Sequence, residues 1–267
     1  REGQFLNYLI TIFALLVTGV ILTRLKPKNK TIHARDGFVI VSLGWILMSL
    51  FGAIPFFLSG EIPNYLDAVF ETVSGFTTTG ASILTDIEAL CHANLFWRSF
   101  THWIGGMGVL VFVMAVLPLA GGGGDLHLMR AESPGPDVGK LVPKSLSTAR
   151  ILYGIYLALT LIEIIMLLIG GMPFFDSVTH TFGTAGTGGF GIKNTSVAGY
   201  SNYIQGVITV FMALFGINFN LYFLLLCGNF KSVFKSEELR SYILIMVAAV
   251  VLIAFDIRTL FATGAEA

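Results

Sequence analysis

Two short runs of threonine and glycine could bind an ion through their backbone carbonyls. They are Thr77-Thr78-Thr79-Gly80, within SGFTTTGAS, and Gly186-Thr187-Gly188-Gly189, within TAGTGGFG. We refer to residues 77–82 and 184–191 as the first and second Thr/Gly segments. Glycine permits left-handed backbone angles, and threonine can fill and hydrogen-bond behind a loop. Closely spaced backbone carbonyls of this kind can replace the hydration shell of a cation, so both runs predict a cation site.

The two segments belong to one internal repeat. Residues 66–83 align without gaps on residues 175–192, with six identities that include Thr78 on Thr187 and Gly80 on Gly189. Matching residues at one fixed offset favour a duplicated unit. In each copy a short apolar helix, Ala68–Val73 or Ser177–Phe182, precedes the segment, and Asp67 and Asp176 are its predicted N-caps.

The elements around these segments read as membrane spans. Of the 267 residues, 55% are hydrophobic and 12% are charged, which is typical of an integral membrane protein rather than a soluble domain. About 20 apolar residues cross a bilayer as a helix, whereas the two short helices can only re-enter it. The stretches long enough to span are Phe5–Leu25, Phe38–Leu58, Phe96–Leu117, Ile151–Gly170, Ile204–Gly228 and Ser241–Phe261.

The basic residues predict how these spans are oriented. Twelve of the 16 Lys and Arg residues fall after the first, third and fifth spans, and short cytoplasmic loops retain positive charge. The N-terminus and residues 59–95 and 171–203 are therefore expected outside, with the three basic loops in the cytoplasm. A short helix that enters from outside points its carbonyl end at the membrane centre, where its dipole favours a cation.

Several other polar residues have a functional and a plain interpretation. Glu163 lies in the middle of a span, where an ionisable group is a candidate for transport or for a buried pair. Asn218 and Asn220 could face a pore or hydrogen-bond between helices, and Gly105, Gly106 and Gly108 favour close helix packing or a bend. The acidic residues of the first outer segment could concentrate cations at a mouth or serve solubility: Glu61, Glu71, Asp86 and Glu88.

The longer motifs resemble the Trk/Ktr/HKT superfamily of potassium transporters, and within it the bacterial TrkH-type subunits. The resemblance extends over nearly the whole chain and implies an all-α integral membrane fold. In that fold, tandem units of span, pore helix, filter loop and span are arranged as in potassium channels. The motifs that carry it are RDGFVIVSLGWILMSLFGAIPF, LDAVFETVSGFTTTGAS, FWRSFTHWIGGMGVLVFVMAVLP, MRAESPGPDVGK and HTFGTAGTGGFG.

The resemblance assigns the Thr/Gly segments as selectivity-filter strands. It implies that the carbonyls of Thr78, Thr79, Thr187 and Gly188 hold potassium, with no covalently bound cofactor. Glycine at positions 80 and 189 fits potassium, because relatives with serine at the first of these positions tend to pass sodium. The residues themselves predict a cation pore, and the choice of potassium rests on the resemblance.

The resemblance also implies domains, partners and a location. The expected divisions are a leading helix (1–30), a first pore repeat (36–120), a cytoplasmic loop (121–148), a second pore repeat (149–230) and the first helix of a third (238–267). Such a chain is expected to be part of a longer protein. Expected partners are the lipid bilayer of the bacterial inner membrane, a second complete channel in a homodimer, and a cytoplasmic ring of nucleotide-binding subunits of the TrkA or KtrA type. Candidate contacts for that ring are Arg130, Glu132 and Lys140.

Other classes of function fit the residues less well. No nucleophile with a base, no phosphate-binding loop and no paired carboxylates are found, so an enzyme is not expected. The net charge is zero, which gives no basic footprint for nucleic acid. The alternative is an alternating-access symporter that moves potassium with sodium or protons, and its repeats would have opposite topologies.

Overall fold

The computed structural model describes residues 3–24, 34–108 and 145–257. Within these ranges all regular elements are helices, and the chain divides into two compact units, Arg1–Gly216 and Ile217–Ala267. The expected all-helical fold is therefore confirmed for the described residues.

The first repeat of the larger unit consists of α2, α3 and α4, with α1 packed against α2. The helix α3 begins where Asn64 caps it, because the Asn64 side chain accepts a hydrogen bond from the Leu66 amide at 3.0 Å. The prediction that Asp67 is the N-cap was wrong, since that residue lies in the first turn. The bounds are α1 Gln4–Arg24, α2 Ala34–Leu58, α3 Tyr65–Phe76 and α4 His92–Met107.

The second repeat has the same order in α7 (Ser145–Ile169), α8 (Phe174–Ala185) and α9 (Asn202–Phe215). The helix α7 ends before Gly171, whose φ of 84° is the left-handed angle that closes many helices. Pro173 is the N-cap of α8, so the prediction of Asp176 as N-cap was also wrong. Proline fits a helix start because the first-turn amides have no partner inside the helix.

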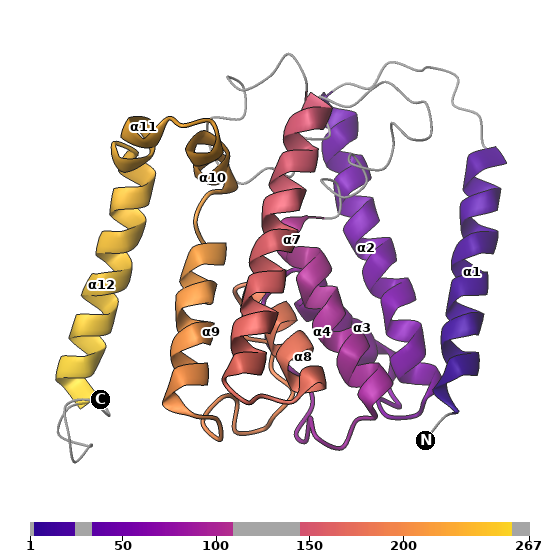
Figure 1. The fold of residues 1–267 in the computed structure, drawn as a ribbon. Coiled ribbons are helices and arrows are strands. Elements are labelled where there is room, and N and C mark those ends of the chain that lie inside the picture. The colour runs from indigo at the N-terminus through magenta and orange to yellow at the C-terminus, as the bar shows by residue number, and fades with distance from the viewer. Residues whose placement is uncertain (1–2, 25–33, 109–144, 258–267) are drawn as a thin grey trace. The chain divides into compact units, whose positions relative to one another are not determined.

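The two short helices occupy equivalent places in the larger unit. In Figure 1, α2 and α7 run in the same direction, and α3 and α8 lie toward the end of the unit where those helices finish. Each short helix has 12 residues, about 18 Å at 1.5 Å per residue, well short of a hydrocarbon core of about 30 Å. Both are therefore re-entrant helices, and both approach from the same side.

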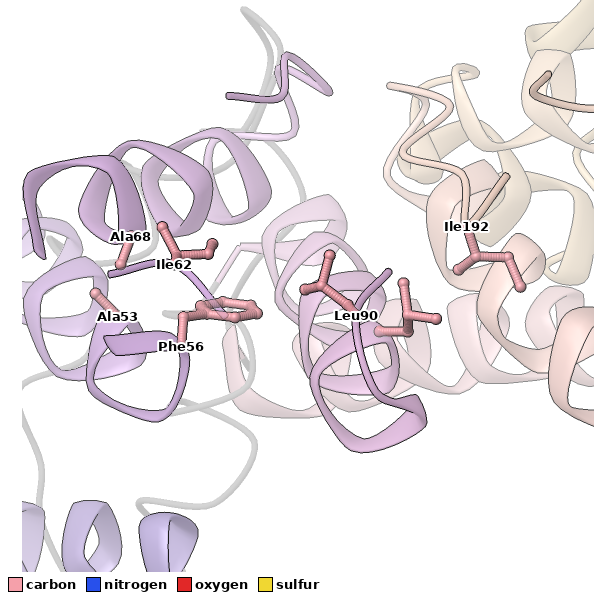
Figure 2. Packing of buried hydrophobic residues seen from close by; sticks show 7 residues of the cluster. Ala53, Phe56, Ile62, Ala68, Leu90 and Ile192 are labelled. Carbon is pink, nitrogen blue, oxygen red and sulfur yellow. The ribbon is translucent and has the colours of Figure 1, made fainter. Parts of the chain in front are cut away.

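Apolar packing joins the two repeats (Figure 2). Ala53 and Phe56 of α2 pack with Ala68 of α3 and with Ile62 and Leu90 in the connections. Ile192, which follows the second Thr/Gly segment, belongs to the same buried cluster, and Phe175 of α8 packs against it. The core of the first repeat is thus completed by residues of the second.

The smaller unit contains α10 (Phe219–Leu226), α11 (Phe230–Phe234) and α12 (Glu237–Ile257). Asn218 caps α10 by accepting from the Asn220 amide, and its own amide donates to the Glu238 carboxylate of α12 at 3.1 Å. Of the two roles weighed for Asn218, the structure therefore shows a hydrogen bond between helices.

The membrane spans agree with the sequence in four places. Gln4–Arg24, Val39–Leu58, Arg150–Ile169 and Glu237–Ile257 are long and apolar enough to cross a bilayer. The fifth predicted span is interrupted, because α9 ends at Phe215 and α10 starts at Phe219. Only residues 96–108 of the third predicted span lie within the described residues, and the helix α4 ends there at Met107.

Candidate functional site

Both Thr/Gly segments leave their short helix with the same unusual backbone. Thr78 and Gly80 have φ values of 55° and 75°, and the equivalent Thr187 and Gly189 have 60° and 67°, whereas the residues between them do not take the left-handed angle. Left-handed threonine costs on the order of 1–3 kcal/mol and persists only where its surroundings enforce it. Alternation of handedness turns successive carbonyls toward one side of the segment, as a ring of cation ligands requires.

The helix ends hold these backbones in place. In the first segment the amides of Thr78 and Thr79 donate to the carbonyls of Gly75 and Ser74, each at 3.0 Å. In the second, the Thr187 amide donates to the Thr184 carbonyl at 2.8 Å. Each segment therefore folds back over the last turn of its own helix.

The carbonyls assigned to potassium are left available by this arrangement. Within the described part of the chain, no hydrogen bond ends on the carbonyl oxygens of Thr78, Thr79, Thr187 or Gly188. Thr77 and Gly186 act instead as the C-caps of α3 and α8. Unpaired carbonyls at membrane depth are tolerated where they line a watery cavity or bind an ion.

The two segments lie against one another. A Cβ added to Gly80 would collide with the Gly188 carbonyl, and one added to Gly188 would collide with the Thr78 carbonyl. Glycine is thus required at both positions by close approach, and at Gly80 also by its positive φ.

The helix α4 backs both segments. Gly105 faces the Phe76 carbonyl and Gly106 faces the Ala185 carbonyl, so closely that a Cβ at either would clash. His102 Nε2 accepts a hydrogen bond from the Gly188 amide at 3.2 Å. Of the two roles weighed for these glycines, Gly105 and Gly106 serve close approach, while Gly108 ends α4 with a φ of 73°.

Sequence reasoning missed a buried ion pair at this site. Arg98 of α4 and Glu71 of α3 are both nearly inaccessible, and Arg98 Nε lies 2.6 Å from Glu71 Oε1. Glu71 is therefore not among the exposed acidic residues at a mouth, which corrects that interpretation. The signal in the sequence was a lone arginine in an apolar span, which calls for a partner of opposite charge.

The exposed loops that follow the two Thr/Gly segments meet through polar contacts. The side chain of Asn194 donates to the Asp86 carboxylate at 2.7 Å, and its backbone amide donates to the Glu88 carboxylate at 3.2 Å. The Lys193 ammonium lies 3.7 Å from the Glu88 carboxylate. Glu61 accepts hydrogen bonds from the Cys91 amide and the Asn94 side chain. These acidic groups thus link segments of the chain to one another.

Two further sets of predicted residues have different outcomes. Glu163 is fully buried in α7, and neither of its carboxylate oxygens has a hydrogen-bond partner among the described residues. Arg130, Glu132 and Lys140 lie outside the described residues, so the predicted regulatory contacts stay predictions.

These features define the class of protein: a multi-pass membrane protein built from tandem units of span, re-entrant pore helix, Thr/Gly segment and second helix. The chain belongs to the TrkH cation transporter family. The family model, whose description is cation transport protein, matches residues 4–263. The family is thus one of cation transporters.

Known proteins similar to this chain agree with that assignment. The Trk system potassium uptake protein TrkH of Salmonella typhimurium is 39% identical over 94% of this chain and 53% of its own length. The protein of the same name from Escherichia coli strain K12 is 38% identical over the same shares. The crystal structure of the potassium transporter TrkH from Vibrio parahaemolyticus superposes with a TM-score of 0.81 at 30% identity, covering 100% of this chain and 55% of that one. The chain spans about half the length of the curated relatives it matches.

Proposed function

We propose that this chain supplies two strands of the selectivity filter in a channel-like potassium uptake pathway across the bacterial inner membrane. The observation that carries the proposal is the paired backbone of the Thr/Gly segments. In both, free carbonyls follow a short helix whose negative dipole end faces them. Potassium is the transported ion, and the names of the similar proteins support its choice over other cations.

The direction of the repeats favours a channel over an alternating-access symporter. Symporters with discontinuous helices often use inverted repeats, whose corresponding helices run in opposite directions. Here α2 and α7 run in the same direction (Figure 1), as expected around an axis along the membrane normal.

The family relationship also supports a set of partners. We propose a homodimer of complete channels whose conduction is gated by a ring of nucleotide-binding subunits on the cytoplasmic side. The N-terminus of this chain would then lie outside and its basic loops would face the ring. Arg130, Glu132 and Lys140 are the contacts to alter first in a binding assay with that ring.

The test is potassium and sodium uptake by the full-length protein in liposomes, comparing wild type with Gly80→Ser. A serine Cβ would collide with the Gly188 carbonyl at a left-handed position, so the K⁺/Na⁺ permeability ratio should fall about tenfold. Gly60→Ser is the matched control, because Gly60 also has a positive φ of 74° but has open space around its Cβ position.

The outcomes separate the proposals. Selectivity lost in Gly80→Ser and retained in Gly60→Ser would support the filter assignment. Equal selectivity in wild type and Gly80→Ser would reduce the first segment to a structural hairpin. Potassium uptake that requires a sodium or proton gradient would favour the symporter.

A further inference from the structure

A charged pair lies buried directly behind the Thr/Gly segments. The side chains of Arg98 and Glu71 are 1% and 0% exposed, and their nearest N–O distance is 2.6 Å. Removing two charges from water is costly, and apolar residues of similar size often serve a core equally well. A buried pair of this kind is therefore weak evidence for stability and suggests another role.

Glu71 holds the outer end of the first Thr/Gly segment. Its two carboxylate oxygens accept hydrogen bonds from the Ser82 hydroxyl at 2.9 Å and the Ile83 amide at 3.0 Å. Ser82 is the last residue of that segment, and Ile83 follows it directly. The carboxylate thus fixes the backbone where the chain leaves the candidate filter.

Arg98 holds the corresponding end of the second segment. Its Nη1 donates to the Gly191 carbonyl at 2.6 Å, and its guanidinium carbon lies 3.4 Å from the centre of the Phe190 ring. The planar guanidinium can donate in two directions and stack on a ring at once, which a lysine ammonium cannot do. One side chain therefore contacts the carboxylate behind the first segment and the carbonyl that ends the second.

We infer that Glu71 and Arg98 are positioning residues that set the spacing between the two filter strands at their outer ends and so contribute to ion selectivity. The inference rests on the proposed function. Selection between potassium and sodium depends on the arrangement and field of the coordinating carbonyls. A chain of hydrogen bonds from Ser82 through the pair to Gly191 restrains that arrangement from behind.

The charges of the pair give the role a distinctive signature. Together they place no net charge beside the pathway. Replacing Glu71 by Gln leaves a buried positive charge that repels cations, whereas replacing Arg98 by Met leaves a negative one that attracts them. Both changes should lower selectivity, but cation conductance at low potassium should fall further in Glu71→Gln than in Arg98→Met. A purely structural pair would lower the conductance equally in the two variants.

The experiment measures reversal potential and conductance of the full-length protein in bilayers with potassium on one side and sodium on the other. Glu71→Gln and Arg98→Met should each lower the K⁺/Na⁺ permeability ratio about fivefold to tenfold, since each removes hydrogen bonds to a charged group. Arg98→Lys should lower the permeability ratio about half as much on a logarithmic scale, because lysine keeps the positive charge but not the forked guanidinium.

Lys193→Met is the matched control. It removes the exposed pair with Glu88, whose side chains are 39% and 45% exposed, and so also breaks a link between the two repeats. Its permeability ratio should stay within about twofold of wild type, since exposed pairs contribute little. An equal loss in this variant would overturn the inference.

Two controls test whether the variants fold. The first is the double variant Glu71→Gln with Arg98→Met, which leaves no unpaired buried charge, and the second is thermal unfolding of every variant. Wild-type selectivity in the folded single or double variants would overturn the inference and leave the proposed function intact. Failure of all of them to assemble while Lys193→Met assembles would assign the pair to folding and also overturn it. Absence of potassium preference in the wild type would instead refute the proposed function.

Discussion

The first and second repeats have nearly the same backbone and different supports. Each has a 12-residue re-entrant helix followed by left-handed residues at equivalent threonine and glycine positions. Behind the first segment lie a carboxylate and hydroxyls. The Ser74 hydroxyl donates to the Ala81 carbonyl, and the Glu71 carboxylate accepts hydrogen bonds from Ser82 and Ile83. Behind the second lie rings, where Phe190 stacks on His102 with centroids 5.2 Å apart. The path of the main chain is shared, and the side chains that enforce it are not.

Because the supporting side chains differ, equivalent positions of the two repeats should respond unequally to substitution. Gly188 occupies the place that Thr79 has in the first repeat, yet it is enclosed by the His102 ring and the Thr78 carbonyl. Glu163 in α7 aligns with Ile54 in α2 at the same offset, so the second repeat alone carries a buried carboxyl there. Comparing the repeats position by position is therefore a direct way to test the site.

The largest effect is expected from Gly188→Ala. The added methyl would collide with both the first segment and the ring of His102, and overpacking of this kind costs about 1–3 kcal/mol. Potassium flux in liposomes should fall about tenfold or more, because ~1.4 kcal/mol corresponds to a factor of ten. Gly199→Ala, with open space at its Cβ position, is the control and should match wild type. Normal flux through folded Gly188→Ala would show that the segments do not meet as described.

A smaller effect is expected at Gly189 than at its counterpart Gly80. The nearest atom to a Cβ at Gly189 is the Met212 methyl at 3.7 Å, an ordinary contact, so only the φ of 67° opposes a side chain. Gly189→Ser should therefore lower the K⁺/Na⁺ permeability ratio by about threefold, from backbone strain of roughly 1 kcal/mol. Both serine variants would be measured side by side. A greater loss at Gly189 would contradict the asymmetry.

The smallest effect concerns the two aspartates at the starts of the pore helices. Asp176 accepts a hydrogen bond from the Tyr200 hydroxyl at 2.7 Å, and Asp67 shows no such bond among the described residues. Both Asp176→Ala and Asp67→Ala lose the same interaction with the helix dipole. Asp176→Ala should lower the free energy of unfolding by about 1 kcal/mol more, because it also loses the hydrogen bond from Tyr200. Thermal unfolding at neutral pH measures the difference.

The hydrogen bond between Tyr200 and Asp176 predicts that stability depends on pH. Burial, with the hydrogen bond to Asp176 and its charge, raises the pKa of Tyr200. The unfolded chain releases this proton near pH ~10 while the folded protein keeps it, so wild type should lose stability as the pH rises above that value. Asp176→Ala should lose less over the same interval. Parallel alkaline curves for the two proteins would rule out the contribution of this bond.

The sequence revealed the repeated elements well, because apolar length and Thr/Gly composition act locally. The re-entrant helices and the left-handed glycines at positions 80 and 189 follow from such patterns. The caps were misassigned because Asn64 and Pro173 lie before the aligned window, and aspartate is an equally good cap in isolation.

The contacts that support the segments could not be predicted in the same way. Glu71 and Arg98 are 27 positions apart, and Arg98 and Gly191 are 93 apart, so no local pattern joins them. The break after Phe215 was hidden within an apolar run, although Gly216 and Asn218 are residues that end and begin helices. Long-range pairing needed the structure, while the charge of Arg98 in an apolar helix already showed that a partner must exist.

The cluster in Figure 2 has a consequence for biogenesis. Ile192 follows Leu95, the last cluster residue of the first repeat, by 97 residues. At a synthesis rate of about 5–20 residues per second, the first repeat waits roughly 5–20 s for the side chain that completes its core. During that interval, the apolar surface that Ile192 covers in the finished cluster remains open. The first repeat therefore reaches its final packing only after the second has been synthesised.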